Sequence, residues 1–77
     1  MKQEDGFFIK AWRVHNTNYA VIIELKNIIS ITAEFEDDYY RAFIRYFGGG
    51  VDEISMNEEI FKELNRMWID YKKENRQ

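Results

Sequence analysis

Side chains that could take part in chemistry are few and widely spaced along this 77-residue chain. His15 is the single histidine and cysteine is absent. A histidine that works in catalysis or metal binding needs partner side chains placed around it, and the sequence offers no such arrangement. Missing cysteines exclude a disulfide framework, a thiolate metal site and cysteine catalysis. The sequence therefore predicts a protein that is not an enzyme and that uses no cofactor or metal.

The glycine run Gly48-Gly49-Gly50 is similar to a phosphate-binding loop in composition alone. A P-loop continues into Lys-Ser/Thr and runs straight into a helix, and neither feature follows here. We expect a hairpin turn in which a glycine adopts a positive φ angle. A binding role for this loop is left open.

Arginines that alternate with aromatic residues form the more informative pattern. Arg41 and Arg45 flank Phe43 at a spacing of two, which places all three on one face of a β-strand. Three interpretations are open: a solvated face, a protein interface, which is where Arg, Tyr and Phe are enriched, or a platform that stacks the bases of single-stranded nucleic acid. The candidate interface or ligand-binding residues on this face are Tyr39, Arg41, Phe43, Arg45, Phe47 and Ile28.

Acidic residues gather at the tip of a predicted hairpin. The formal net charge is −3, from 14 acidic and 11 basic residues, and this sign opposes binding to nucleic-acid phosphates. The same charges would suit contact with a basic groove of a nucleic-acid-binding protein, whereas the ordinary interpretation is a solvated loop. The candidate partner-contacting residues are Glu34, Glu36, Asp37 and Asp38.

Hydrophobic periodicity predicts the elements that position these residues. Strands are expected at about 7–15, 19–25, 28–36 and 39–47, and a short return at 51–54 would make a fifth. A helix is expected at about 56–73, opened by a capping box from Ser55 to Glu58. The apolar stripe of this helix consists of Ile60, Phe61, Leu64, Met67, Trp68 and Tyr71. Residues 1–6 are polar and expected to be disordered within a single domain of residues 1–77.

The predicted turn at Asp37-Asp38 fixes a register for the surrounding hairpin. It places Phe35 opposite Tyr40, and Glu34 opposite Arg41 as a pair of opposite charges. The same register puts Thr32 beside Phe43, and Ile28 beside Phe47. The expected fold is α+β: an antiparallel meander of four or five strands with one C-terminal helix packed on one face. That face carries Ile29, Ile31, Ala33 and Phe35 together with Tyr40, Ala42, Ile44 and Tyr46.

The small size of the chain favours self-association. A domain of this length buries little apolar surface, and it lacks the disulfides that stabilise many small domains. We therefore expect a homo-oligomer that binds a partner protein. A small anionic ligand held between subunits by Arg41, Arg45 and the glycine loop is an alternative. The longest apolar runs are too short to span a membrane, and the acidic start lacks the apolar core of a signal peptide, so a cytoplasmic location is expected.

The segment Leu25-Lys26-Asn27-Ile28-Ile29-Ser30-Ile31 leads into a strand, an acidic turn, another strand, a glycine turn and Ser-x-x-Glu before a helix. This order, over roughly Ala11 to Met67, resembles the small bacterial flagellar accessory proteins of the FlbD type. The chain departs from that pattern in its longer, aromatic-rich helix and in three glycines where the family has an Asn-Gly turn. The resemblance implies a small non-enzymatic accessory protein of a bacterium, with no catalytic residues to carry over. Phage-encoded inhibitors share the same general size and acidity, so bacterial and phage origins are both open.

Overall fold

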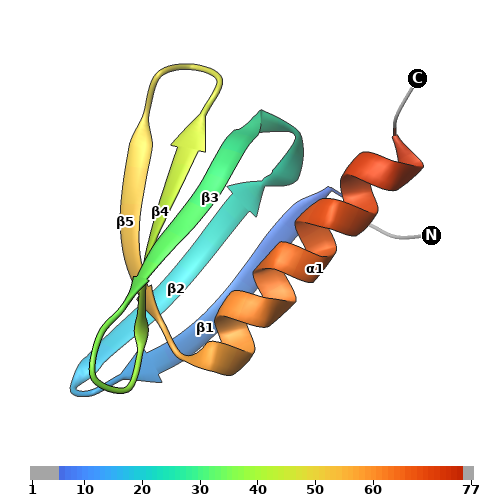
Figure 1. Cartoon of the computed structure of the whole chain (residues 1–77). Helices are drawn as coiled ribbons and strands as arrows, with labels where there is room; N and C mark the ends of the chain where they lie inside the picture. Colours follow the sequence, from blue (N-terminus) through green and yellow to red (C-terminus); the bar gives the residue numbers. More distant parts are fainter. Residues whose placement is uncertain (1–5, 76–77) are drawn as a thin grey trace.

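Five β-strands, one short 3-10 turn and one α-helix form the fold in this computed structural model, which describes residues 6–75 (Figure 1). The elements are β1 (Phe7–Val14), β2 (Thr17–Glu24), η1 (Leu25–Asn27), β3 (Ile28–Phe35), β4 (Tyr40–Tyr46), β5 (Val51–Met56) and α1 (Glu58–Glu74). The α+β class and the C-terminal helix are confirmed. The single meander is wrong, because β1–β2 forms one sheet and β3–β4–β5 forms another.

The break between the two sheets lies at η1. Leu25 is only 3% exposed, and its backbone N–H donates to the carbonyl oxygen of Gly6 over 2.8 Å. Burying this leucine turns the chain out of the direction of β2, so β3 starts a new sheet instead of pairing with β2. The expectation of disorder for residues 1–6 falls outside the described residues except at Gly6, which this hydrogen bond holds in place.

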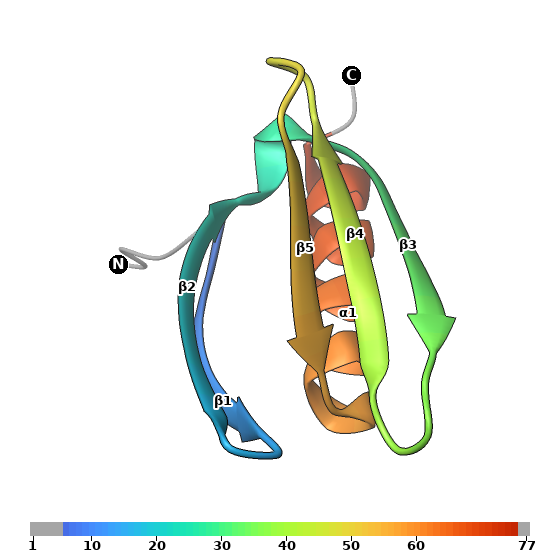
Figure 2. The same ribbon diagram turned by 90° about the vertical axis from the view of Figure 1, so that its left-hand side faces the viewer.

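The two sheets and the helix enclose one core. Figure 2 shows the three-stranded sheet in front of α1, with the β1–β2 hairpin beside β5. The most extensive helix contacts are with η1, β1, β4 and β5, and β3 is not among them. The helix stripe is confirmed, since Leu64 and Ile60 are buried. The other buried core residues are Phe8, Ile23, Leu25, Ile28, Ala42, Ile44, Ile54 and Met56.

The predicted register of the β3–β4 hairpin is confirmed over most of its length. Phe35 lies opposite Tyr40, Glu34 opposite Arg41 and Thr32 opposite Phe43, around a loop at residues 36–39. A β-bulge between Ile28 and Ser30 shifts the pairing at the far end, so that Ile28 lies opposite Tyr46 and not beside Phe47. The extra residue of a bulge displaces the strand that carries it, and Ile28 enters the core with 4% of its surface exposed.

The start of α1 also differs from the predicted capping box. Asn57 is the N-cap, and its side-chain oxygen accepts from the backbone N–H of Ile60 over 2.9 Å. Ser55 instead belongs to β5, which continues two residues beyond the predicted strand. Extended backbone at Ser55 pairs with β4, so the first helical turn begins later than the sequence pattern suggested.

Candidate interaction surfaces

The outer face of the three-stranded sheet is organised around Arg41. Its Nη2 contacts carboxylate oxygens of Glu34, at 3.5 Å, and of Glu36, and its Nη1 lies 3.5 Å from Glu53 Oε2. The hydrogen bond with Glu36, followed by the charges of Glu36 and Glu34, raises the pKa of the Arg41 guanidinium. Three carboxylates from this chain therefore balance the charge of Arg41, and two of them belong to the predicted acidic cluster.

The other predicted residues of this face are only partly brought together. Phe43 is half-buried and lies between Thr32 and Glu53, while Arg45 is exposed between Ser30 and Val51. Arg41, Phe43 and Arg45 thus share a face as the alternation predicted, set among polar neighbours. Two further predicted residues lie elsewhere. Ile28 is in the core, and Phe47 lies in the glycine turn with 70% of its surface exposed.

The tip of the β3–β4 hairpin meets the turn between β1 and β2. His15, in that turn, places Nε2 3.1 Å from Asp38 Oδ1, and its ring lies edge-on to Tyr39 with centroids 5.3 Å apart. His15 adopts a positive φ of 56°, an uncommon conformation for a residue with a side chain. No local sequence pattern indicates this contact, because it joins residues 23 positions apart. Of the four residues of the acidic cluster, Asp37 is the one without an ion pair in the described chain.

Exposed apolar side chains fall in three places. Ile9 and Ile22 are opposite each other on the β1–β2 hairpin, and Phe47 and Val51 flank the glycine turn. The third group follows β3 and the neighbouring side of α1, where Phe35 is 66%, Ile29 45% and Ile69 49% exposed. These residues are the exposed large hydrophobic side chains of the described chain.

A continuous aromatic row links β3 to α1. The ring of Phe35 packs edge-on against Tyr40 with centroids 5.0 Å apart, and Tyr40 stacks on Phe61 of the helix at 4.7 Å. Phe61 and Ile69 also line a shallow groove along α1 together with Lys62, Asn65, Arg66 and Asp70. We call the surface formed by Ile31, Phe35, Tyr40, Phe61 and Ile69 the β3 flank.

The expectation that α1 covers the side of β3 that carries Ile29 and Phe35 is wrong for these two residues. Phe35 is 66% and Ile29 45% exposed, whereas Ile31 between them is partly buried against the core. The β1–β2 hairpin occupies the side next to β5, and Lys10 of β1 forms an ion pair with Glu63 of α1 at 3.0 Å. These contacts hold the helix mainly over β4, β5 and β1, and β3 is not among the elements that it contacts most.

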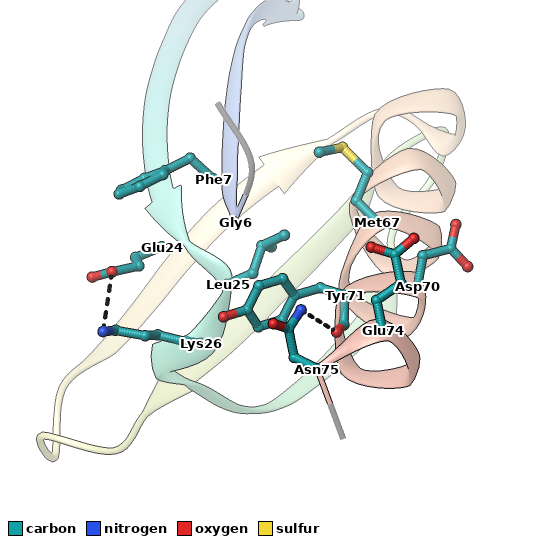
Figure 3. A pocket seen from close by; sticks show the side chains of 10 residues that line it. All are labelled: Gly6, Phe7, Glu24, Leu25, Lys26, Met67, Asp70, Tyr71, Glu74 and Asn75. Atoms are coloured by element: carbon teal, nitrogen blue, oxygen red, sulfur yellow. Dashed lines mark hydrogen bonds and ion pairs between the residues drawn. The ribbon is translucent and has the colours of Figure 1, made fainter. Parts of the chain in front are cut away.

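A separate open pocket of about 590 Å³ lies between η1 and the end of α1 (Figure 3). Its charged lining residues are Glu24, Asp70 and Glu74 with one cation, Lys26, which pairs with Glu24 at 3.8 Å. The ring of Tyr71 forms one wall close to Gly6. The excess of carboxylates makes this pocket unsuited to the anionic ligand considered above.

Within residues 6–75, no three histidine or acidic side chains are grouped to hold a metal ion. The described helix is neither long nor apolar enough to cross a membrane. Comparisons with family models, with curated proteins and with solved structures found no match to this chain.

Proposed function

We propose that this chain is a small non-enzymatic protein-interaction module of bacterial or phage origin, which acts in the cytoplasm by binding a partner protein. The observation that carries the proposal is the β3 flank, an apolar surface beside a strand whose outer edge is unpaired in the described chain. Exposed apolar surface of this kind, bordered by polar residues, is typical of protein interfaces.

Two features of β3 strengthen this proposal. Edge strands of natural proteins are usually protected by short length, lysines or other charges, prolines or bulges. β3 has one bulge near its start and one charged residue, Glu34, but it is eight residues long and contains neither lysine nor proline. An extended segment of another protein can add to such an edge through main-chain hydrogen bonds, while pockets on the flank select its side chains.

The two alternatives receive less support from the geometry. An anionic ligand would need a free Arg41, and this guanidinium already contacts three carboxylates. An acidic inhibitor would present unpaired carboxylates to a basic groove, whereas Glu34 and Glu36 share Arg41 and Asp38 contacts His15 within the chain. We therefore favour the protein-interaction module over both.

Photocrosslinking in bacterial cells tests the proposal. A photoreactive phenylalanine analogue placed at Phe35 samples the β3 flank, and the same analogue at Ile22 is the control, because both side chains are largely exposed at 66% and 73%. We expect a discrete protein adduct from position 35 and none from position 22. The absence of any adduct from position 35, or identical adducts from both positions, would overturn the proposed function.

A further inference from the structure

The two edges of the three-stranded sheet differ in whether another part of the chain covers them. The edge at β5 is covered by the β1–β2 hairpin, and Trp12 Nε1 donates to the backbone carbonyl oxygen of Ser55 there over 2.8 Å. The edge at β3 has no strand beside it in the described chain, and it stands at the opposite side of the sheet (Figure 2). One edge is thus closed by the chain itself, and the other is left for an outside partner.

We propose that the partner at the β3 edge is a second copy of this chain, related by a two-fold axis perpendicular to the sheet. The two β3 strands pair antiparallel and make one continuous six-stranded sheet, with both copies of α1 on the same side. This inference rests on the proposed function and names the partner that the β3 flank receives.

The sequence of β3 selects one register for this pairing. Opposite residues of an antiparallel pair point to the same face, so a slip of one residue would place polar side chains against the apolar flank. The bulge ends the regular ladder at Ser30, and the regular pairing with β4 continues to Phe35, with Thr32 near its middle. We therefore place the two-fold axis at Thr32, with each Thr32 opposite its counterpart.

This register is self-complementary in polarity and charge. Ile31 lies opposite the partner's Ala33 on the helix side, and Ser30 lies opposite the partner's Glu34 on the outer face. The glutamate, which is the one charged residue of β3, therefore does not meet its own copy. At the ends of the paired strands, Phe35 of each chain approaches the partner's Ile29, the extra residue of the bulge. Phe35 and Ile29 are the two most exposed apolar side chains of β3. They therefore meet across the interface in two symmetry-related contacts.

Moving the axis by one residue, which shifts the register by two, loses this match. An axis at Ile31 would place Phe35 opposite Asn27, which belongs to η1 and not to the strand. An axis at Ala33 would place Ile29 opposite Asp37, in the hairpin loop. Each of these registers leaves one exposed apolar residue of β3 without an apolar partner.

The part of the β3 flank that lies on α1 completes the interface. Stable interfaces involve roughly 20 residues from each partner, more than the eight of β3 supply. The groove residues Phe61 and Ile69 extend the apolar surface, and the groove also contains Arg66 and Asp70. In an antiparallel arrangement of the two helices, Arg66 of each copy is directed toward Asp70 of the other, so the helix charges are complementary as well.

Charge substitution at the proposed axis tests the inference by solution mass. Thr32 is exposed on the outer face, so Thr32→Lys leaves the folded chain intact but sets two lysines side by side at the axis. We expect the wild-type chain to have twice the 9.4 kDa chain mass and Thr32→Lys to have the mass of one chain. Thr17→Lys, at an exposed threonine of β2, is the matched control and is expected to remain dimeric. Circular dichroism checks that each variant is folded.

Complementary variants then test the position of the axis. Thr32→Glu alone is expected to be monomeric, and an equal mixture of Thr32→Lys and Thr32→Glu is expected to form a heterodimer. Because the chain has no cysteine, Thr32→Cys should form an intermolecular disulfide on oxidation, since opposite residues lie within bridging distance. Ser30→Cys alone should not, whereas Ser30→Cys mixed with Glu34→Cys should cross-link.

The outcomes separate this inference from the proposed function. A monomeric wild-type chain, or a dimer that Thr17→Lys dissociates and Thr32→Lys does not, would overturn the β3 pairing. If position 35 still captured a different protein in cells, the interaction module would stand with another partner at the same edge. If position 35 captured nothing and the chain were monomeric, both proposals would be wrong.

Discussion

The indole N–H of Trp12 donates a 2.8 Å hydrogen bond to the backbone carbonyl oxygen of Ser55 and thereby ties the two sheets together. The same indole stacks on Tyr19 of β2, with ring centroids 5.6 Å apart. One side chain thus satisfies an edge carbonyl of β5 and packs the hairpin beside the larger sheet. No ladder hydrogen bonds join these sheets in the described chain, so side-chain contacts such as this bond and the His15–Asp38 contact fix their packing.

Replacement of Trp12 by phenylalanine removes this hydrogen bond and keeps an aromatic ring. We expect the free energy of unfolding to fall by about 1–3 kcal/mol, because the Ser55 carbonyl loses its partner in a partly buried site. Urea denaturation followed by circular dichroism measures the change. Trp68→Phe is the control, since Trp68 is also half-buried and carries a cation–π contact from Lys72, worth about 0.5–1 kcal/mol at an exposed site. Equal losses for both variants would contradict the importance of the bond to Ser55.

The N-cap of α1 allows a direct comparison of the sequence-based expectation with the structure. Asn57→Ala removes the acceptor for the Ile60 N–H and is expected to lower the free energy of unfolding by about 1 kcal/mol. Ser55→Ala, at the position that the capping-box pattern favoured, is expected to cost less than about 0.5 kcal/mol. The reverse order in urea denaturation would show that the helix begins at Ser55 after all.

Much of the fold could be predicted from local periodicity. The alternation in residues 29–35 and 40–46 gave the correct pairing of Phe35 with Tyr40 and of Glu34 with Arg41, because a period of two leaves few acceptable registers. The spacing of Ile60, Leu64 and their neighbours likewise gave the buried side of α1. Both patterns depend on residues close in sequence, which a single chain displays directly.

The arrangement of the two sheets could not be predicted in the same way. The chain turns at η1, where Leu25 is buried, and β3 does not pair with β2. The short segment Lys26-Asn27 by itself predicts only an ordinary turn between neighbouring strands. Once the β1–β2 hairpin lies beside β5, the helix is drawn toward it and Phe35 is left exposed. Long-range packing determines which apolar face the helix covers. For this reason the structure favours the β3 flank as the interaction surface, whereas the sequence pattern favoured the face that carries Arg41 and Arg45.

Alkaline pH should destabilise the chain partly through Tyr46. Burial, followed by the hydrogen bond to Asp52 at 2.9 Å and by the charge of Asp52, raises the pKa of the Tyr46 hydroxyl far above its ordinary value of 10.0. Below pH 10 this hydroxyl is protonated in the folded and the unfolded chain. Above pH 10 it ionises first in the unfolded chain, so stability falls by at most about 1.4 kcal/mol per pH unit until the folded state also ionises.

Tyr46→Phe removes this titration and provides the test. We expect its free energy of unfolding to decline less steeply than that of the wild type between pH 9 and pH 11. Tyr39→Phe, whose hydroxyl takes part in no hydrogen bond of the described chain, is the comparison variant that corrects for the loss of any one tyrosine. Parallel pH profiles for wild type and Tyr46→Phe would contradict the assignment.

Two substitutions on opposite sides of α1 should separate folding from association. Leu64 is fully buried, and Leu64→Ala is expected to cost about 2–5 kcal/mol at any protein concentration, because it opens a cavity in the core. Ile69 belongs to the part of the β3 flank that lies on α1 and is half-exposed, so Ile69→Ser should cost little in the isolated chain. A dimer gains stability with protein concentration by mass action. We therefore expect the urea midpoint of the wild type to rise with protein concentration, and that of Ile69→Ser to rise less.

The control is Ile22→Ser, on the β1–β2 hairpin, whose urea midpoint should depend on protein concentration as that of the wild type does. If Ile22→Ser and not Ile69→Ser abolished the concentration dependence, the association surface would lie on the β1–β2 hairpin instead.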